Sequence, residues 1–292
     1  MESWTSSADT LRGNVAMVTG ANAGMGKEIS LGLARMGATL VMVSRDRERG
    51  EAARAEVEQK TGNRDVGLLL ADLSSQLSIR HLVQEFGARH DRLHVMVNNA
   101  GVTLSKRLET ADGLETVFAT NHLASFLLTN LLLPVLLASA PARVVIVSSA
   151  AHSMGKIDFA DLQSARKYDE IRAYNASKLA NVLFTYELAR RLAGTGVTAN
   201  VVEPGFVKTN LRVPFPFSLF SFMRGSVVEG ARPTMFVSAS DSLDGITGTF
   251  FNKKGEATRS SQLSYDEEAA RRLWQVSAEL THLEENARPS RS

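Results

Sequence analysis

Tyr174 and Lys178 have a spacing that suits proton transfer, because residues four apart lie on the same face of a helix. A free phenol has a pKa of about 10, and a neighbouring ammonium lowers that pKa by favouring the phenolate. Tyr174 could then exchange a proton near neutral pH, as a reaction that forms or consumes an alkoxide requires. A Tyr and a Lys at this spacing are usually surface residues, so the surrounding elements must decide whether the pair is a site.

A glycine-rich turn near the start of the chain predicts a phosphate site. Residues 14–20 form a short apolar run typical of a buried parallel strand, and residues 27–36 carry apolar side chains at helical spacing. Gly20, Gly24 and Gly26 lie at this junction. Glycine allows positive φ and a close approach of the backbone to a phosphate, and a helix N-terminus offers N–H groups and partial positive charge. The strand–turn–helix context therefore favours a nucleotide site.

The rest of the chain alternates between strand and helix patterns. Further strands are expected at residues 38–43, 66–70, 93–97, 143–147, 198–202 and 247–251. Helices are expected at residues 46–60, 77–87, 116–142 and 177–192. Such alternation predicts βαβ units with right-handed crossovers. We therefore expect an α/β protein with a single doubly wound Rossmann domain over residues 1–280, about seven parallel strands flanked by helices, and a polar tail over residues 281–292.

Composition excludes several classes of protein. The chain has 292 residues, of which 44% are hydrophobic and 22% charged, as is ordinary for a globular protein. It has no cysteine, which excludes disulfides, cysteine-ligated metal sites and a cysteine nucleophile. No set of His, Asp and Glu has metal-ligand spacing, so no metal is expected. The 33 basic and 31 acidic residues are too balanced to suggest a nucleic-acid partner.

One long segment must be weighed against a membrane span. Residues 116–142 contain no Asp, Glu, Lys or Arg, and a spanning helix needs about 20 mostly apolar residues. The segment also carries Asn121, His122, Asn130 and Pro134, which favours a helix buried in the core or on one side of a subunit contact. Residues 1–14 are polar, with the pattern of neither a secretory signal nor a membrane anchor. We expect a cytoplasmic protein without a membrane span.

Four more motifs follow the predicted strands in order. They are Asn-Asn-Ala-Gly at residues 98–101, Ser-Ser at residues 148–149, Tyr174 with Lys178, and Pro-Gly at residues 204–205. Together with the G-x-x-x-G-x-G spacing of the first turn, they resemble the short-chain dehydrogenase/reductase family over most of the chain. The resemblance implies an oxidoreductase that uses a nicotinamide dinucleotide.

The resemblance places the cofactor at the carboxyl ends of the strands. An acidic residue after the second strand would favour NAD, whereas Ser44 and Arg45 suit the 2′-phosphate of NADP(H). Arg45 could instead be a solvated residue at the start of a helix, and Asp72 could be only the N-cap of the next helix. The expected cofactor contacts are Gly20, Asn22, Ala23, Gly24, Met25, Gly26, Ser44, Arg45, Asp72, Leu73, Asn99, Ala100, Gly101, Tyr174, Lys178, Pro204, Gly205, Val207 and Thr209.

The resemblance also implies four catalytic residues. Tyr174 would be the general acid or base, and Lys178 would lower its pKa and hold the nicotinamide ribose. Ser149 would polarise the substrate carbonyl, with Ser148 as the alternative. Asn121 matches the family position that orders a proton relay through Lys178, although it could instead be a buried helix residue bonded to backbone.

The segment between the catalytic serine and tyrosine points to one branch of the family. Twenty-four residues separate Ser149 from Tyr174, about a dozen more than the shortest members carry. With residues 178–184 and 272–277, this insertion looks like the retinol dehydrogenase-like branch, which includes the WW-domain oxidoreductase. The related light-dependent protochlorophyllide reductase uses a cysteine that is absent here. Two histidines are expected at the edge of the site, His152 at its mouth and His122 as a structural neighbour of Asn121.

Residues 211–228 contain four phenylalanines and two prolines, and by position they are the family's substrate lid. An apolar cover suits a lipophilic aldehyde, ketone or alcohol. The same residues could form a subunit contact or a peripheral membrane contact, and a homodimer and a homotetramer are both open. We expect NADP(H)-dependent hydride transfer to or from a lipophilic carbonyl or alcohol. A non-catalytic NADP(H)-binding sensor or scaffold is the alternative.

Overall fold

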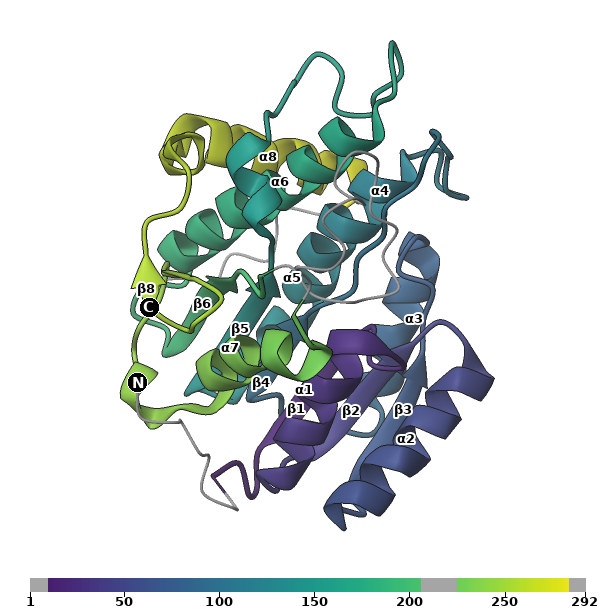
Figure 1. The fold of residues 1–292 in the computed structure, drawn as a ribbon, viewed down its shortest axis with the longest axis vertical. Helices are drawn as coiled ribbons and strands as arrows, with labels where there is room; N and C mark the ends of the chain where they lie inside the picture. The colour runs from purple at the N-terminus through teal and green to yellow at the C-terminus, as the bar shows by residue number, and fades with distance from the viewer. Residues whose placement is uncertain (1–9, 206–224, 284–292) are drawn as a thin grey trace.

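Eight strands form one sheet at the centre of this computed structural model, which describes residues 10–205 and 225–283 (Figure 1). Their order across the sheet is β3-β2-β1-β4-β5-β6-β7-β8. Strands β1 to β7 are parallel, and β8 pairs antiparallel with β7. The strands are β1 (Val15–Thr19), β2 (Thr39–Ser44), β3 (Val66–Leu70), β4 (Val95–Asn98), β5 (Ala142–Val147), β6 (Val197–Val202), β7 (Phe250–Phe251) and β8 (Ala257–Thr258).

The α/β class and the doubly wound sheet are confirmed. The central strands β1, β4 and β5 are nearly continuous apolar runs, and a parallel strand covered on both faces needs such a run. The two-residue strand β8 was not predicted, because both of its residues are exposed and carry no apolar pattern. Strand order reverses between β1 and β4, which is where ligands bind in sheets of this kind.

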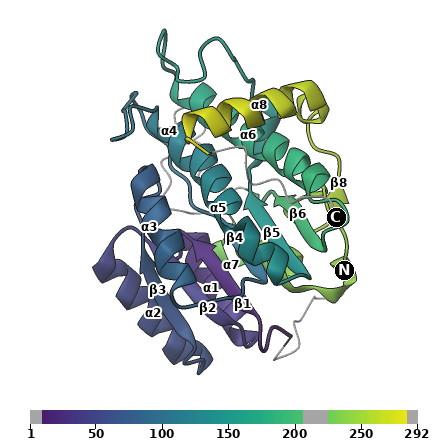
Figure 2. The same cartoon turned by 180° about the vertical axis from the view of Figure 1, so that it is seen from behind.

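Helices cover both faces of the sheet. Helices α1, α2 and α7 lie on the side nearer the viewer in Figure 1, and α3, α5 and α6 lie on the opposite side, which Figure 2 shows, with α8 outside α6. Each layer has its own apolar core against one face of the sheet. The helices are α1 (Gly24–Arg35), α2 (Arg47–Thr61), α3 (Gln76–Gly87), α4 (Thr116–Phe118), α5 (Ala124–Ala138), α6 (Glu170–Arg191), α7 (Val227–Ala239) and α8 (Glu267–Leu280).

The helix expected over residues 116–142 is divided into α4, a π-helical turn at residues 119–123 and α5, which ends at Ala138. Helices α6, α7 and α8 differ further from the sequence prediction. Helix α6 begins at Glu170, seven residues before the predicted start, because Asp169 accepts a hydrogen bond from the Arg172 N–H and caps it. Helices α7 and α8 were not predicted. Helix α7 begins with a capping box between Ser226 and Glu229, so the last two residues of the predicted lid, 227 and 228, belong to this helix. Lid residues 211–224 and tail residues 284–292 lie outside the described part of the chain.

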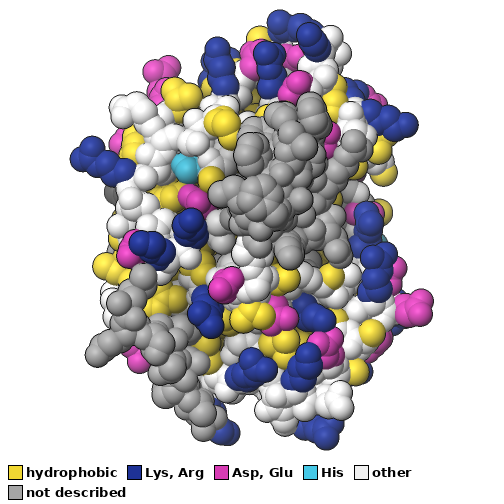
Figure 3. Space-filling view, in the orientation of Figure 1, with side chains coloured by type: hydrophobic (Ala, Val, Ile, Leu, Met, Phe, Trp, Pro, Cys, Tyr) yellow, Lys and Arg dark blue, Asp and Glu magenta, His cyan; other side chains and the backbone are white. Residues whose placement is uncertain are grey.

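The uncharged segment that was weighed as a membrane span is a core helix. Residues Thr116–Ala138 are long and apolar enough to cross a membrane, but 72% of the relevant window is buried inside the protein. Phe126 packs against Phe184 of α6 and Trp274 of α8, with ring centroids 5.4 and 5.0 Å apart. The same packing explains why α8 lies across α6 (Figure 2). On the face that Figure 3 shows, Lys and Arg side chains are interspersed with Asp and Glu.

Replacing Phe126 with alanine should reduce the free energy of unfolding by about 3–5 kcal/mol, because the ring is fully buried and its removal leaves a cavity between three helices. Urea unfolding followed by far-UV circular dichroism measures the loss. The control is Leu77→Ala on α3, where the side chain is 62% exposed and the change should stay within about 0.5 kcal/mol. Equal losses in the two variants would contradict the position of Phe126 in the core.

Candidate active site

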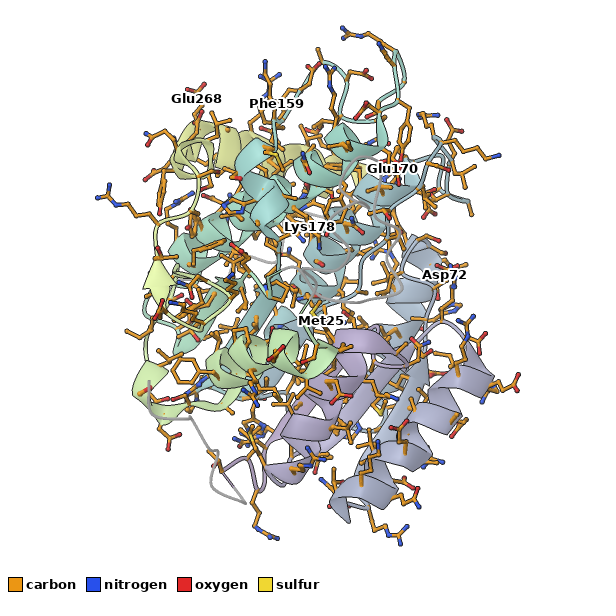
Figure 4. The ribbon with its side chains drawn as sticks, in the orientation of Figure 1. Met25, Asp72, Phe159, Glu170, Lys178 and Glu268 are labelled. Carbon is orange, nitrogen blue, oxygen red and sulfur yellow. The ribbon has the colours of Figure 1, made fainter. Side chains whose placement is uncertain are left out.

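A cleft of about 960 Å³ opens at the carboxyl ends of the strands, next to the point where the strand order reverses. Figure 4 labels three residues that line it: Met25 at the start of α1, Lys178 on α6, and Asp72 after β3. These residues come from segments more than 40 positions apart in the sequence, and the parallel sheet brings them to one edge.

Most of the predicted site residues line this cleft. Ser44 and Asn121 are buried next to it without lining it, and Val207 and Thr209 lie outside the described residues. Those that line the cleft are Gly20, Asn22, Ala23, Gly24, Met25, Gly26, Arg45, Asp72, Leu73, Asn99, Ala100, Gly101, Ser149, Tyr174, Lys178, Pro204 and Gly205.

The glycine turn leaves space and N–H groups for an anion. A Cβ on Gly26 would lie 2.2 Å from the carbonyl oxygen of Gly20, so only glycine allows α1 to start this close to β1. Gly20 and Gly24 have positive φ values of 65° and 55°. Ala23 occupies the N-cap of α1 and offers no side-chain hydrogen bond, so no side chain caps the first N–H groups of this helix. These features fit a dinucleotide phosphate.

Thr19, at the end of β1, holds the neighbouring turn in place. Its hydroxyl accepts hydrogen bonds from the N–H groups of Asn99 (2.9 Å) and Ala100 (3.1 Å). The Asn99 side-chain amide in turn donates to the Thr19 carbonyl oxygen at 2.9 Å. Sequence reasoning missed this threonine. Its position directly before the first glycine of the turn could have indicated a role at the site.

The end of β2 presents two arginines to the cleft. Arg45 and Arg49 both line it, and Arg49 is paired with Asp46 at 3.4 Å. Arg49 was not predicted, although its place one helical turn after Arg45 could have indicated it. The Ser44 hydroxyl donates to the Asp46 carbonyl oxygen at 2.9 Å and is buried, so it forms the turn into α2. A contact between Ser44 and a phosphate stays a prediction.

Asp72 is not the N-cap of the helix that follows it. Ser75 caps α3, whereas the Asp72 carboxylate accepts hydrogen bonds from the N–H and hydroxyl of Ser74 at 2.9 and 2.7 Å. The Ser78 hydroxyl accepts a bond from the Asp72 N–H at 2.9 Å. This turn holds Asp72 and Leu73 at the cleft wall, where the sequence placed the adenine contacts.

Ser149 and Tyr174 both line the cleft, and the interaction of the Ser149 hydroxyl with Tyr174 opposes the rise in the pKa of the tyrosine. The tandem serines have different partners. Ser148 is 2% exposed, and its hydroxyl donates to the carbonyl oxygen of Lys178 at 2.9 Å. The structure therefore brings Ser149 rather than Ser148 to the tyrosine.

Lys178 is buried beneath the tyrosine, with 3% of its surface exposed. Its Nζ donates to the Val147 carbonyl oxygen at 3.2 Å and lies 5.6 Å from the centroid of the Tyr174 ring. Burial lowers the pKa of Lys178 to about 8, because the charged ammonium loses its hydration.

One expectation about this pair is wrong for the structure. The sequence predicted that Lys178 lowers the pKa of Tyr174, but burial raises that pKa, and only the interaction with Ser149 opposes the rise. The physical reason is that Lys178 is buried and Tyr174 is partly buried, so desolvation favours the neutral form of each.

Asn121 is a buried residue bonded to backbone, as one of its two interpretations expected, and its part in a proton relay stays a prediction. Its side chain accepts from the Val102 N–H at 2.7 Å and donates to the Val102 carbonyl and the Ser177 hydroxyl, each at 3.0 Å. A Cβ on Gly101 would lie 3.3 Å from Asn121 Oδ1 and 3.4 Å from Lys178 Nζ. Asn121 lies in a π-helical turn, η1 (Ala119–Leu123), a geometry frequent at functional sites.

The two histidines near the site are both buried. His122 contacts the Ser277 hydroxyl at 2.9 Å, and burial lowers its pKa to about 4, which confirms it as a structural neighbour of Asn121. His152 was expected at the mouth of the site. This is wrong, because its ring is 4% exposed, packs on Phe250 and does not line the cleft.

The outer part of the cleft is largely apolar. Met154 and Leu108 are 59% and 45% exposed at its rim, and the sequence analysis did not find them because isolated apolar residues in loops carry no periodic signal. Hydrogen bonds join the insertion to this wall. Tyr168 donates to the Leu104 carbonyl at 2.8 Å, and Gln163 accepts from the Glu115 N–H through its amide oxygen at 2.7 Å and from Arg107 Nε through its backbone carbonyl at 2.9 Å. Further lining residues here are Val102, Thr103, Leu104, Thr116, Thr120 and Ile171.

The family model for short chain dehydrogenases matches residues 14–216, which is more than half of the chain and includes the glycine turn, Ser149, Tyr174 and Lys178. The chain is a short-chain dehydrogenase/reductase. Members of this family are oxidoreductases, and the enzyme class follows from that membership. In the described part of this short-chain dehydrogenase/reductase, no group of three or more His, Asp or Glu side chains could hold a metal ion.

Individual relatives support the same assignment. Retinol dehydrogenase 12 from Bos taurus is 46% identical over 275 residues, which cover 92% of this short-chain dehydrogenase/reductase and 87% of the relative. The crystal structure of an uncharacterized protein from Mycobacterium paratuberculosis has a TM-score of 0.79 and 33% identity, covering 96% and 97% of the two chains. The RhlG/NADP active-site complex from Pseudomonas aeruginosa has a TM-score of 0.69 and 27% identity, covering 84% and 97%. The retinol dehydrogenase-like branch is thereby confirmed.

Replacing Lys178 with methionine should raise the free energy of unfolding near neutral pH. The folded-state pKa of about 8 lies below the ordinary value of 10.5, so the folded protein carries the full cost of the buried charge below pH 8. Between pH 8 and pH 10.5, Lys178 binds more protons in the unfolded chain than in the folded protein. The free energy of unfolding of the wild type therefore rises with pH in this interval. The gain in Lys178→Met should shrink over the same interval.

Urea unfolding at a series of pH values measures this difference. The control is Lys60→Met on α2, which removes a lysine charge from a half-exposed side chain and so relieves no buried charge. A gain in Lys178→Met that stayed constant with pH would contradict the lowered pKa.

Proposed function

We propose that this short-chain dehydrogenase/reductase is an NADP(H)-dependent enzyme that transfers a hydride between nicotinamide and a lipophilic aldehyde, ketone or alcohol. The observation that carries the proposal is that Ser149, Tyr174 and buried Lys178 line the same cleft as the glycine turn, with Lys178 Nζ 5.6 Å from the centroid of the Tyr174 ring. A proton donor and a polarising hydroxyl aimed at one point are what carbonyl reduction requires.

The residues present fit a dinucleotide. The glycine turn and the uncapped start of α1 would hold the pyrophosphate, Asp72 and Leu73 the adenine, and residues 99–101 the nicotinamide end. Val207 and Thr209 are proposed for the carboxamide by resemblance alone. When bound, the cofactor supplies or accepts the hydride.

The side chains of this chain would handle the proton. In reduction, the substrate oxygen accepts hydrogen bonds from Ser149 and Tyr174, and Tyr174 gives it a proton as negative charge develops there. Lys178 lies against the Tyr174 ring, where it would hold the nicotinamide ribose and pass on the replacement proton. Asn121 keeps the segment at Gly101 and Val102 beside that lysine.

A lipophilic substrate is supported by the apolar rim of the cleft at Leu108 and Met154. Bovine retinol dehydrogenase 12, by its name, acts on retinol, which is a lipophilic alcohol. The proposed lid over residues 211–228 would add further apolar surface. We also propose a cytoplasmic location, and a homodimer and a homotetramer are both compatible with the proposal.

Replacing Tyr174 with phenylalanine should lower kcat by about 10²–10⁴-fold and should weaken NADPH binding far less, because the proton donor is lost while the other expected cofactor contacts remain. NADPH oxidation is measured with a panel of long-chain aldehydes, aromatic ketones and retinal, and NADPH binding by fluorescence titration. The control Tyr265→Phe removes a half-exposed hydroxyl outside the cleft and should leave kcat within a few-fold. Equal rates for wild type and Tyr174→Phe would refute the mechanism.

The same assay separates the enzyme from the alternative. Tight NADPH binding by the wild type, with no turnover of any carbonyl or alcohol, would favour a sensor or scaffold.

Replacing Arg45 with aspartate should weaken NADPH binding by more than about tenfold relative to NADH. A guanidinium binds a 2′-phosphate through two charge-assisted hydrogen bonds, whereas a carboxylate repels it. The cleft also contains Arg49, and the NADP complex of RhlG supports the same cofactor. The control is Arg47→Asp, which makes the same charge change two residues later, on an exposed side chain that does not line the cleft. An unchanged NADPH-to-NADH ratio in Arg45→Asp would exclude this role.

A further inference from the structure

His152 is a buried residue beside the catalytic serine that the proposed mechanism does not use. It lies in the 3₁₀ helix η2 (Ala150–Met154), which begins directly after Ser149. Its imidazole is turned away from the cleft and packs on the ring of Phe250 in β7, with centroids 4.8 Å apart. Only 4% of the residue is exposed.

Both ring nitrogens have partners that determine the tautomer. The Ser261 N–H can only donate, and it lies 3.1 Å from Nε2, so Nε2 must be the acceptor. The proton of the neutral ring is therefore on Nδ1, which donates to the Ser149 carbonyl oxygen at 2.7 Å. Burial lowers the pKa of His152 and so favours this neutral ring, although the bond to Ser149 opposes the shift. The same carbonyl also accepts the His152 N–H at 3.0 Å.

The segment that holds Nε2 is itself attached to α6, the helix that carries Tyr174. The Ser260 hydroxyl lies 2.6 Å from the Tyr186 hydroxyl on α6. At the other end of η2, Gly155 lies so close to α6 that a Cβ there would be 2.5 Å from the Asn175 carbonyl oxygen. His152 therefore connects Ser149, after the end of β5, to Ser261. The neighbouring Ser260 is in turn bonded to Tyr186 on α6.

We propose that neutral His152 is a positioning residue, which orients Ser149 in the cleft that it shares with Tyr174 by donating from Nδ1 to the Ser149 carbonyl while the Ser261 N–H holds Nε2. This inference rests on the proposed function, because it assigns His152 to the support of the same serine. His152 touches neither the cleft nor the reacting atoms. Its effect on the reaction comes through the orientation of the Ser149 backbone and hydroxyl.

Two substitutions separate the two hydrogen bonds. In His152→Asn the side-chain amide takes the place of Nδ1 and can still donate to Ser149, whereas the bond from Ser261 is lost. In His152→Gln the amide takes the place of Nε2 and can still accept from Ser261, whereas the bond to Ser149 is lost. Both variants lose the same ring packing against Phe250, so each is the packing control for the other.

We expect His152→Gln to lower kcat by at least about tenfold, since a small displacement of a catalytic group has a large effect on rate. In His152→Asn, kcat should stay within a few-fold of wild type. The KM for NADPH and the binding of NADPH should change in neither variant, because the glycine turn is not touched. Equal losses of kcat in the two variants, or losses that follow their melting temperatures, would overturn the proposal.

A measurement without turnover tests the tautomer separately. In protein labelled with ¹⁵N-histidine, His152 is assigned by the signal that disappears in His152→Asn. We expect a neutral ring protonated at Nδ1 near neutral pH, and a ring protonated at Nε2 or at both nitrogens would overturn the proposal. If the wild type turns over no carbonyl or alcohol, the proposed function fails, and the ¹⁵N result still decides the arrangement of His152 by itself.

Discussion

The end of β5 and helix α6 are hydrogen-bonded to each other in both directions. The Ser148 hydroxyl donates to the Lys178 carbonyl, and the Lys178 ammonium donates to the Val147 carbonyl. An unpaired ammonium would not be stable at this depth, because its desolvation costs several kcal/mol. The lysine can be buried there only if helix and strand keep this relative position. Tyr174, one helical turn earlier, then lines the same cleft as Ser149, which follows the end of this strand.

Other parts of the fold position groups around the contact between β5 and α6. The parallel sheet brings the glycine turn, the Thr19 hydroxyl and the segment at Asn99 to the same edge, so that a dinucleotide and the Ser149–Tyr174 pair share one cleft. The π-helical turn at Asn121 positions an amide that bonds to Val102 and to Ser177, the residue before the lysine. His152 in η2 is hydrogen-bonded to the Ser149 carbonyl and to the Ser261 N–H, and so links the serine to the C-terminal segment. The site is thus supported by residues from both halves of the chain.

Several elements could be predicted because their signals are local. Strand β3 has the predicted bounds, since an apolar run between polar residues determines a buried strand. The glycine turn follows from spacing alone. The start of α6 was placed too late because the capping contact of Asp169 leaves no periodic pattern, and β8 was missed because its exposed residues have none. Ser44 has the residue type that suits a phosphate, but only the fold shows that its hydroxyl forms the turn into α2.

The sequence by itself determined the fold class, the order of the motifs and the identity of the residues that could exchange a proton, because each of these depends on neighbours along the chain. The tertiary structure decided how far those residues are buried and which hydrogen bonds they form. Burial, which involves groups far apart in the sequence, raises the pKa of Tyr174 where the local spacing predicted the opposite. His152 also lies turned away from the cleft in the folded chain, and the N–H of Ser261, 109 residues later, donates to its Nε2. Desolvation and such long-range hydrogen bonds exist only once the chain has folded.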